Sequence, residues 1–126
     1  MQHPHLIRLI HYSLAFFWIY QGLIPKLLFI SPEEIAFWQW LGLNETHARL
    51  AGQGSGIAEI LFGLSFIFIR HPYLHYLSIM GLLGLFGLVI LVMPYTLLAA
   101  FNPVVMNGAM LVLSLVYLSL NKAKNN

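Results

Sequence analysis

Long runs of apolar residues separated by short polar stretches make up most of the chain. Four such runs cover residues 6–28, 50–69, 73–93 and 103–120. Each is close to the roughly 20 residues that an α-helix needs to cross a hydrocarbon core about 30 Å thick. The pattern therefore predicts an all-α protein, a bundle of four transmembrane helices that forms a single domain over residues 1–126.

The first run has one competing interpretation, a cleaved signal peptide. Arg8 precedes the apolar residues as the basic segment of a signal peptide would. The run is long and rich in aromatic side chains, however, and it lacks a small-x-small cleavage site. We therefore expect a retained helix, with a kink at Pro25 that frees backbone carbonyls.

The polar stretch after the first run carries signals for a short helix. Ser31 is suited to the N-cap, Pro32 to the first helical position, and Glu34 to the third position of a capping box. The apolar and aromatic residues that follow are Ile35, Phe37, Trp38, Trp40 and Leu41. We expect an amphipathic interfacial helix between the first and second spans, because indole rings favour the headgroup region.

Composition also indicates a membrane protein rather than a soluble globular one. The chain has 126 residues, of which 60% are hydrophobic and 8% charged, so it has more apolar surface than a soluble domain of this size can bury. The lipid bilayer is the expected partner. The six basic residues of the chain form no stripe that could bind nucleic acid. The absence of cysteine excludes disulfides and thiolate chemistry within the chain.

The distribution of basic residues predicts the orientation. With four spans, Arg8, Arg70, Lys122 and Lys124 all fall on one side of the membrane. Because short cytoplasmic segments carry an excess of Lys and Arg, that side is expected to be the cytoplasm. Both termini should therefore be cytoplasmic.

Glu59 is the most informative residue for function. It lies nine positions after Leu50, about 14 Å along a helix and near the middle of the bilayer. An ionised carboxylate there costs on the order of 2.5 kcal/mol, so Glu59 should face the bundle interior, be protonated or have a partner. Gly52, Gly56 and Gly63 share its stripe and would allow close helix contact. A functional site and a buried hydrogen-bonded residue are both compatible with this pattern.

Four more residues complete a candidate intramembrane pocket. Trp18 and Gln21 share a stripe of the first helix, Lys26 lies on an adjacent stripe, and Asn107 should point inward because an amide facing lipid leaves polar groups unpaired. We expect Trp18, Gln21, Lys26, Glu59 and Asn107 to lie in the outer half of the bundle, with Lys26 as the first candidate partner of Glu59. A lysine near the end of a span more commonly extends to the outer interface, so this is the preferred interpretation of Lys26 taken alone, and a neighbouring helix is the preferred partner of Asn107. No catalytic residue is identified.

The histidines occur in two close pairs, His3 with His5 and His71 with His75. Neither pair has a carboxylate or cysteine nearby, and metal sites usually assemble three or four ligands. We therefore expect interfacial histidines and no metal site.

Several of these segments together resemble a known family. They are Trp18-Ile-Tyr-Gln-Gly-Leu-Ile-Pro-Lys26, Ala51-Gly52 leading to Glu59 and Gly63, and Phe101-Asn-Pro103 with Asn107. Over nearly the whole chain the sequence resembles the DoxX-like family, small four-helix proteins of the bacterial inner membrane. The resemblance implies a redox association, because relatives in the wider DoxX/DoxD group are described as membrane components of thiosulfate:quinone oxidoreductase or of oxidative-stress complexes.

The first functional hypothesis is therefore an accessory or quinone-binding subunit of a membrane redox system. The chain itself offers no electron carrier, so quinone and a redox partner subunit are the implied cofactor and partner. One alternative is a small transporter or an ion-conducting homo-oligomer that uses Glu59, and another is a purely structural interaction protein. Whether the protein is an enzyme is left open.

Overall fold

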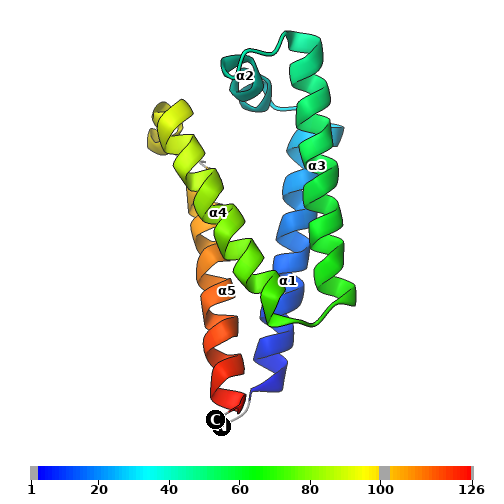
Figure 1. Ribbon diagram of the computed structural model, residues 1–126, viewed down its shortest axis with the longest axis vertical. Coiled ribbons are helices and arrows are strands. Elements are labelled where there is room, and N and C mark those ends of the chain that lie inside the picture. The colour runs from blue at the N-terminus through cyan, green and yellow to red at the C-terminus, as the bar shows by residue number, and fades with distance from the viewer. Residues whose placement is uncertain (1–2, 100–102, 126) are drawn as a thin grey trace. The chain divides into compact units, whose positions relative to one another are not determined.

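The structure is a computed structural model, and it describes residues 3–99 and 103–125. Its elements in chain order are α1 (Pro4–Leu23), the π-helical turn η1 (Ile24–Leu28), α2 (Pro32–Trp40), α3 (Glu45–Phe68), α4 (Pro72–Val92), the 3-10 turn η2 (Pro94–Leu98) and α5 (Pro103–Asn125) (Figure 1). The described residues contain no strand, which confirms the all-α prediction.

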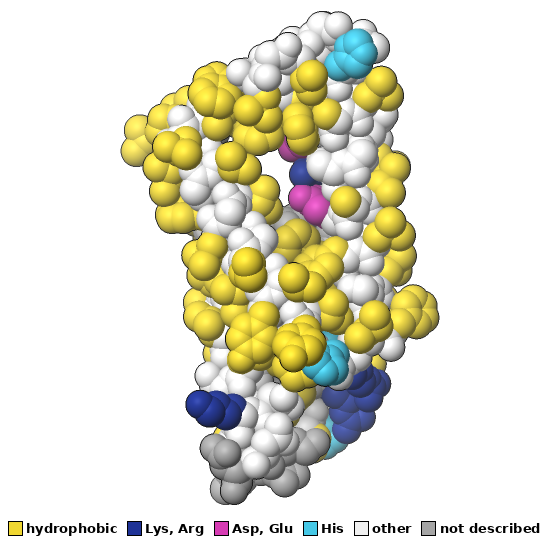
Figure 2. Space-filling view, viewed as in Figure 1, with side chains coloured by type: hydrophobic (Ala, Val, Ile, Leu, Met, Phe, Trp, Pro, Cys, Tyr) yellow, Lys and Arg dark blue, Asp and Glu magenta, His cyan; other side chains and the backbone are white. Residues whose placement is uncertain are grey.

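Three helices are long and apolar enough to cross a membrane, namely α3, α4 and residues Val104–Ala123 of α5. The segment Pro4–Leu28 passes the same test only together with α2, from which it is separated by an 86° bend, so the number of candidate spans is three or up to four. Hydrophobic side chains cover most of the face in Figure 2. Length and composition thus fit a membrane protein.

Capping residues explain where two of the spans begin. The second apolar run begins at Leu50, but α3 begins at Glu45 because Asn44 Oδ1 accepts a hydrogen bond from the His47 amide at 2.9 Å. In α4, His71 plays the same part, since its Nδ1 accepts from the Tyr73 amide at 3.2 Å. His71 is therefore a cap.

The chain forms two compact units. Unit 1 consists of residues 1–14 and 66–126, and it contains the start of α1, the end of α3, and α4, η2 and α5. Unit 2 consists of residues 15–65 and contains the rest of α1, η1, α2 and most of α3. In unit 1, α4 packs against α5, and Ser78 and Leu82 of α4 are buried, as are Met110 and Ser114 of α5.

Glycines set the contact between α1 and α3 within unit 2. A Cβ atom placed on Gly56 would lie 2.6 Å from the Gly22 carbonyl oxygen, and one placed on Gly63 would lie 2.9 Å from the Ala15 carbonyl oxygen. No side chain fits into either gap, so the two backbones approach closely, as small residues allow in helix pairs. The stripe predicted for Gly56 and Gly63 is thus a helix contact, whereas Gly52 faces α2 instead.

The predicted kink at Pro25 takes the form of a widened helical turn. Proline has no amide hydrogen to donate to the carbonyl four residues earlier. The helix instead closes with the Phe29 amide donating to the Ile24 carbonyl at 2.9 Å, an i+5 bond of the π type. The Ser31 amide then donates to the Pro25 carbonyl at 2.9 Å, and the chain turns into α2.

Candidate functional site

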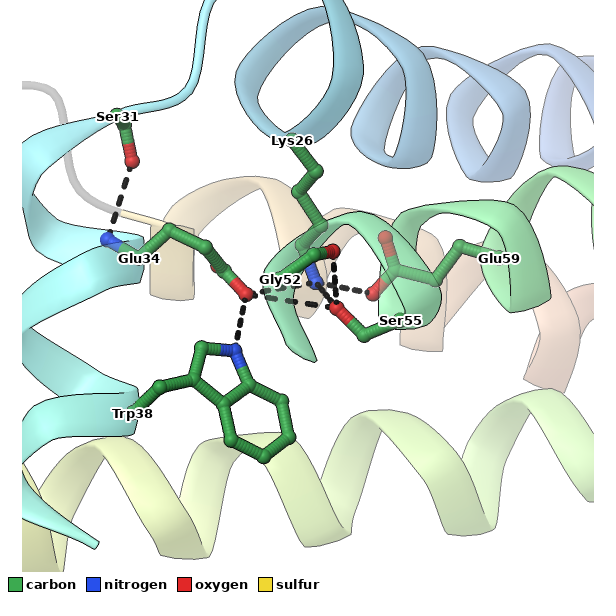
Figure 3. Close-up of polar contacts among 7 residues, drawn as sticks. All are labelled: Lys26, Ser31, Glu34, Trp38, Gly52, Ser55 and Glu59. Atoms are coloured by element: carbon green, nitrogen blue, oxygen red, sulfur yellow. Dashed lines mark hydrogen bonds and ion pairs between the residues drawn. The ribbon is translucent and has the colours of Figure 1, made fainter. Parts of the chain in front are cut away.

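An ion pair between η1 and α3 forms the centre of a polar site in unit 2. Lys26 Nζ donates to Glu59 Oε1 at 2.9 Å and to Ser55 Oγ at 3.2 Å. The same ammonium lies 3.6 Å from Glu34 Oε1. Figure 3 shows Lys26 reaching from the α1 side towards Glu34 of α2 and towards Ser55 and Glu59 of α3. Lys26, the first candidate partner of Glu59, is confirmed as its partner, and the preferred interpretation, in which Lys26 extends to the outer interface instead, is wrong.

The indole of Trp38 holds the carboxylate of Glu34 in place. Trp38 Nε1 donates to Glu34 Oε1 at 2.9 Å, from one turn later in α2. Ser55 has one hydroxyl proton and two acceptors in reach, the Gly52 carbonyl at 2.8 Å and Glu34 Oε1 at 3.4 Å, so the shorter bond to Gly52 is favoured. We call Lys26, Glu34, Trp38, Ser55 and Glu59 the charged cluster.

The cap of α2 is half of the predicted capping box. Ser31 Oγ accepts a hydrogen bond from the Glu34 amide at 3.2 Å, as predicted. The reciprocal bond from the Glu34 side chain to the Ser31 amide was predicted wrongly, because that amide already donates to the Pro25 carbonyl. The Glu34 carboxylate is thereby free to turn towards Trp38 and Lys26.

Burial and charge set the character of the charged cluster. The side chains of Lys26 and Glu59 are 14% and 13% exposed, and that of Glu34 is 18% exposed. Glu59 Oε2 is buried, and no described group hydrogen-bonds to it. With both glutamates ionised the cluster holds two negative charges and one positive charge. The cluster therefore has one hydrogen-bond acceptor without a partner among the described residues, Glu59 Oε2. It also has two carboxylates but only one ammonium group.

The remaining predicted site residues lie in both units. Trp18 is buried in unit 2 with its ring edge-on to Phe62 at a centroid distance of 5.0 Å. Gln21 is buried in the same helix, next to the close contact at Gly22. Asn107 is buried on α5 in unit 1. That all five residues line one pocket stays a prediction. The predicted cap at Asn102 lies outside the described residues.

Glu34, Trp38 and Ser55 were not predicted as site residues, although the sequence carried a signal for them. Glu34 and Trp38 are four residues apart, as are Ser55 and Glu59, so each pair shares one face of its helix. The capping signal at Ser31 already explained the presence of Glu34, so its contacts with Lys26 and Trp38 were not predicted.

A second polar group, the histidine pair, lies in unit 1. His11 Nδ1 and His75 Nε2 are 3.0 Å apart, so one ring donates a hydrogen bond to the other. Both side chains are buried, at 3% and 0% exposure. Tyr117 stacks on His75 with a centroid distance of 3.6 Å and an interplanar angle of 10°, and Phe66 lies edge-on to His75 at 5.1 Å.

His75 is buried in the protein, while its predicted position at the membrane interface stays a prediction. The spacing of four suggested a common environment for His71 and His75, but His71 precedes α4 as its cap. His75 lies in the first turn of α4, on the buried face that continues through Ser78 and Leu82. Among the described residues no group of three or more His, Cys, Asp or Glu side chains is arranged to hold a metal ion.

Comparison with known proteins assigns the chain to a family. A family model described as the DoxX-like family matches residues 15–115. The chain belongs to the DoxX-like family. The resemblance inferred from the sequence motifs is thereby confirmed, and membership together with the apolar helices supports a membrane protein. No curated protein and no solved structure matches the chain.

The extent of the match separates the two polar groups. All members of the charged cluster lie within the residues that match the DoxX-like family, and so does His75. His11 and Tyr117 lie outside them. The histidine pair of this protein is thus completed by residues beyond the matched region, whereas the charged cluster is contained in it.

Proposed function

We propose that this DoxX-like protein is an accessory subunit of a membrane redox system and that its charged cluster binds the head group of a quinone or quinol. The observation that carries the proposal is the pairing of an ammonium donor with an unused acceptor. Lys26 Nζ can donate to a quinone carbonyl oxygen, and Glu59 Oε2 can accept a hydrogen bond from a quinol hydroxyl. Both side chains are largely buried, and Glu59 Oε2 is fully buried.

The charge of the cluster supports a role for Glu59 in moving a proton. Oxidation of a quinol releases two protons and two electrons. Because the cluster has one carboxylate more than it has ammonium groups, Glu59 can take up one of these protons, and its uptake leaves the cluster neutral. The two electrons and the second proton would pass to a partner subunit, so the part of this chain is to bind the head group and accept one proton.

Quinone content of the purified protein tests the proposal. The protein is purified from its own membranes in a mild detergent, extracted with organic solvent, and its quinone quantified by mass spectrometry. We expect bound quinone in the unaltered protein and a large loss in Glu59→Gln and in Lys26→Met. Arg49→Gln is the matched control, because Arg49 lies on the same helix in an exposed ion pair with Glu45 at 3.0 Å. Equal quinone content in all four proteins, or none in any, contradicts the proposal.

A small transporter or ion-conducting oligomer is the second candidate, and the same unused acceptor favours it. A proton or a monovalent cation at Glu59 Oε2 would balance the charge of the cluster as a quinol proton does. Ion flux into liposomes that is lost in Glu59→Gln, together with no quinone in the extracts, would replace the first proposal by this one.

We further propose that the protein lies in the bacterial inner membrane with both termini in the cytoplasm. The Lys and Arg residues at the two chain ends and between α3 and α4 support this orientation. A fusion of alkaline phosphatase after Lys124 should be inactive, because this enzyme works only in the periplasm, whereas a cytoplasmic fluorescent reporter at the same position should be bright. The opposite pair of results contradicts the orientation.

A further inference from the structure

An open groove lies between the first turns of α4 and the last turns of α5, within unit 1. Its volume is about 480 Å³. One part of its wall is apolar or aromatic and is formed by Tyr76, Leu115 and Leu118. The other part is polar and is formed by His71, Ser119, Asn121 and Lys122. The groove is thus amphipathic along its length.

The polar end of the groove has a positive charge with no acidic side chain to balance it. All four acidic residues of the chain lie between positions 33 and 59, in unit 2. Unit 1 carries only basic charged side chains, at Arg8, Arg70, Lys122 and Lys124. Lys122 is exposed and forms no ion pair among the described residues. A ligand with a negative charge therefore meets no competing carboxylate side chain from unit 1.

His71 adds a hydrogen-bond donor whose orientation is set by its role as a cap. Its Nδ1 accepts from the Tyr73 amide, so the neutral ring carries its proton on Nε2. The ring also stacks on Tyr73 with a centroid distance of 4.5 Å and an interplanar angle of 28°. Stacking and capping together hold the imidazole at the rim, where Nε2 can donate to an anion.

We propose that this groove binds an anionic phospholipid. The phosphate lies at Lys122 with hydrogen bonds from Asn121 and His71, and an acyl chain lies along Tyr76, Leu115 and Leu118. The apolar wall is continuous with two candidate membrane spans, and Tyr side chains are favoured where a span meets the headgroups. Basic pockets between transmembrane helices on the cytoplasmic side bind anionic headgroups, because the opposite charges attract. A free phosphate ion would leave the apolar wall unused.

Binding of defined lipids to the purified full-length protein tests this site. Affinities for phosphatidylglycerol, which is anionic, and phosphatidylcholine, which is zwitterionic, are measured in detergent by native mass spectrometry, with inorganic phosphate as a third ligand. We expect phosphatidylglycerol to bind more tightly than phosphatidylcholine, and phosphate to compete weakly or not at all. Lys122→Gln should lower the affinity for phosphatidylglycerol about fivefold, which is roughly the effect of one basic residue at a membrane surface.

Two further variants keep the test decisive. Arg8→Gln removes the same charge from unit 1 without altering the groove lining, so it should leave the affinity nearly unchanged. Lys122→Arg keeps the charge and should therefore retain most of the affinity for phosphatidylglycerol. An equal loss in Arg8→Gln, equal binding of the two lipids, or full competition by phosphate would overturn the proposal. None of these outcomes depends on the charged cluster in unit 2, so quinone binding and lipid binding can fail separately.

Discussion

The two units place polar side chains inside an apolar chain in different ways. Unit 2 uses full charges, with the Lys26 ammonium against the carboxylates of Glu59 and Glu34. Unit 1 uses two imidazoles that share one hydrogen bond and are enclosed by the rings of Tyr117 and Phe66. The first group is partly open, and Glu59 Oε2 is an acceptor without a partner among the described residues. The second is enclosed by aromatic rings, and its two outer ring nitrogens, His11 Nε2 and His75 Nδ1, also have no hydrogen-bond partner among the described residues.

This difference separates a site for chemistry from a packing element. A buried ion pair loses solvation energy and recovers it only through good geometry and further hydrogen bonds. With both glutamates ionised, the charged cluster has an excess of one negative charge, and Glu59 Oε2 has no hydrogen-bond partner among the described residues. A proton or a hydrogen-bond donor from a ligand would therefore stabilise it. The histidine pair gains from stacking and one neutral hydrogen bond, and nothing in its charge demands a ligand. The proposed quinone site therefore lies in unit 2, and for the histidine pair we propose a structural part.

Breaking the ion pair should give the largest loss of stability. Lys26→Met leaves Glu59 without its partner, and we expect a loss of about 3 kcal/mol in the free energy of unfolding. Adding Glu59→Gln to this variant should recover part of the loss, because the remaining side chain is then uncharged. Reversible unfolding in mixed detergent micelles measures all the variants, including Glu59→Gln alone. Strictly additive losses would mean that the two side chains are not coupled.

Separating the helices of unit 2 should have the next largest effect. Gly56→Ala places a methyl group 2.6 Å from the Gly22 carbonyl oxygen and 2.8 Å from Lys26 Cβ, so α1 and α3 must move apart. We expect a loss of about 2 kcal/mol. Gly54→Ala is the matched control on the same helix, because nothing lies within 4 Å of its added Cβ, and it should stabilise the protein by up to about 1 kcal/mol. Similar thermal shifts for both changes would contradict the close contact.

The histidine pair should respond more weakly, because no charge is involved. His75→Phe keeps a ring against Tyr117 but leaves His11 Nδ1 without its partner, which should cost about 1–2 kcal/mol. His11→Leu combined with His75→Phe should be less destabilised than the sum of the single changes. Thermal unfolding of the four proteins gives the coupling. If His75→Phe also abolished quinone content, the contrast between the two units would fail.

Loss of the α2 cap should have the smallest effect. Ser31→Ala removes the acceptor for the Glu34 amide, at an expected cost of about 1 kcal/mol. The effect should be local, so hydrogen exchange in α2 should rise while exchange in α4 stays unchanged. Ser31→Asp should restore protection, because aspartate is an equally good cap. Faster exchange throughout both helices would show that the cap stabilises more than α2.

The sequence was sufficient to predict features that depend on spacing along one helix. Apolar runs identified the helices, Pro25 the kink, and Gly56 and Gly63 a close helix contact, although the sequence did not show that α1 is the partner. The depth of Glu59 pointed to an inward partner, and Lys26 was the first candidate because it is the basic residue at the outer end of the first helix. Each of these inferences needs only helical geometry and the cost of a buried charge.

Features that depend on tertiary contacts were not predictable in the same way. His11 and His75 are 64 positions apart, and neither position carries a local pattern that links them. Glu34 already had a local explanation as a capping residue, so its contact with Lys26 was not visible from spacing. In both cases the partner is chosen by how the helices pack, which a single sequence does not specify.

Infrared difference spectroscopy of the protein in lipid tests the central claim, that Glu59 is the group that responds to a bound quinol. Spectra are recorded on addition of a short-chain quinol and of the matching quinone, with Arg49→Gln as the control. We expect a quinol-induced change in the carboxyl region that is absent in Glu59→Gln and intact in the control. The same carboxyl change in Glu59→Gln as in the unaltered protein would contradict it.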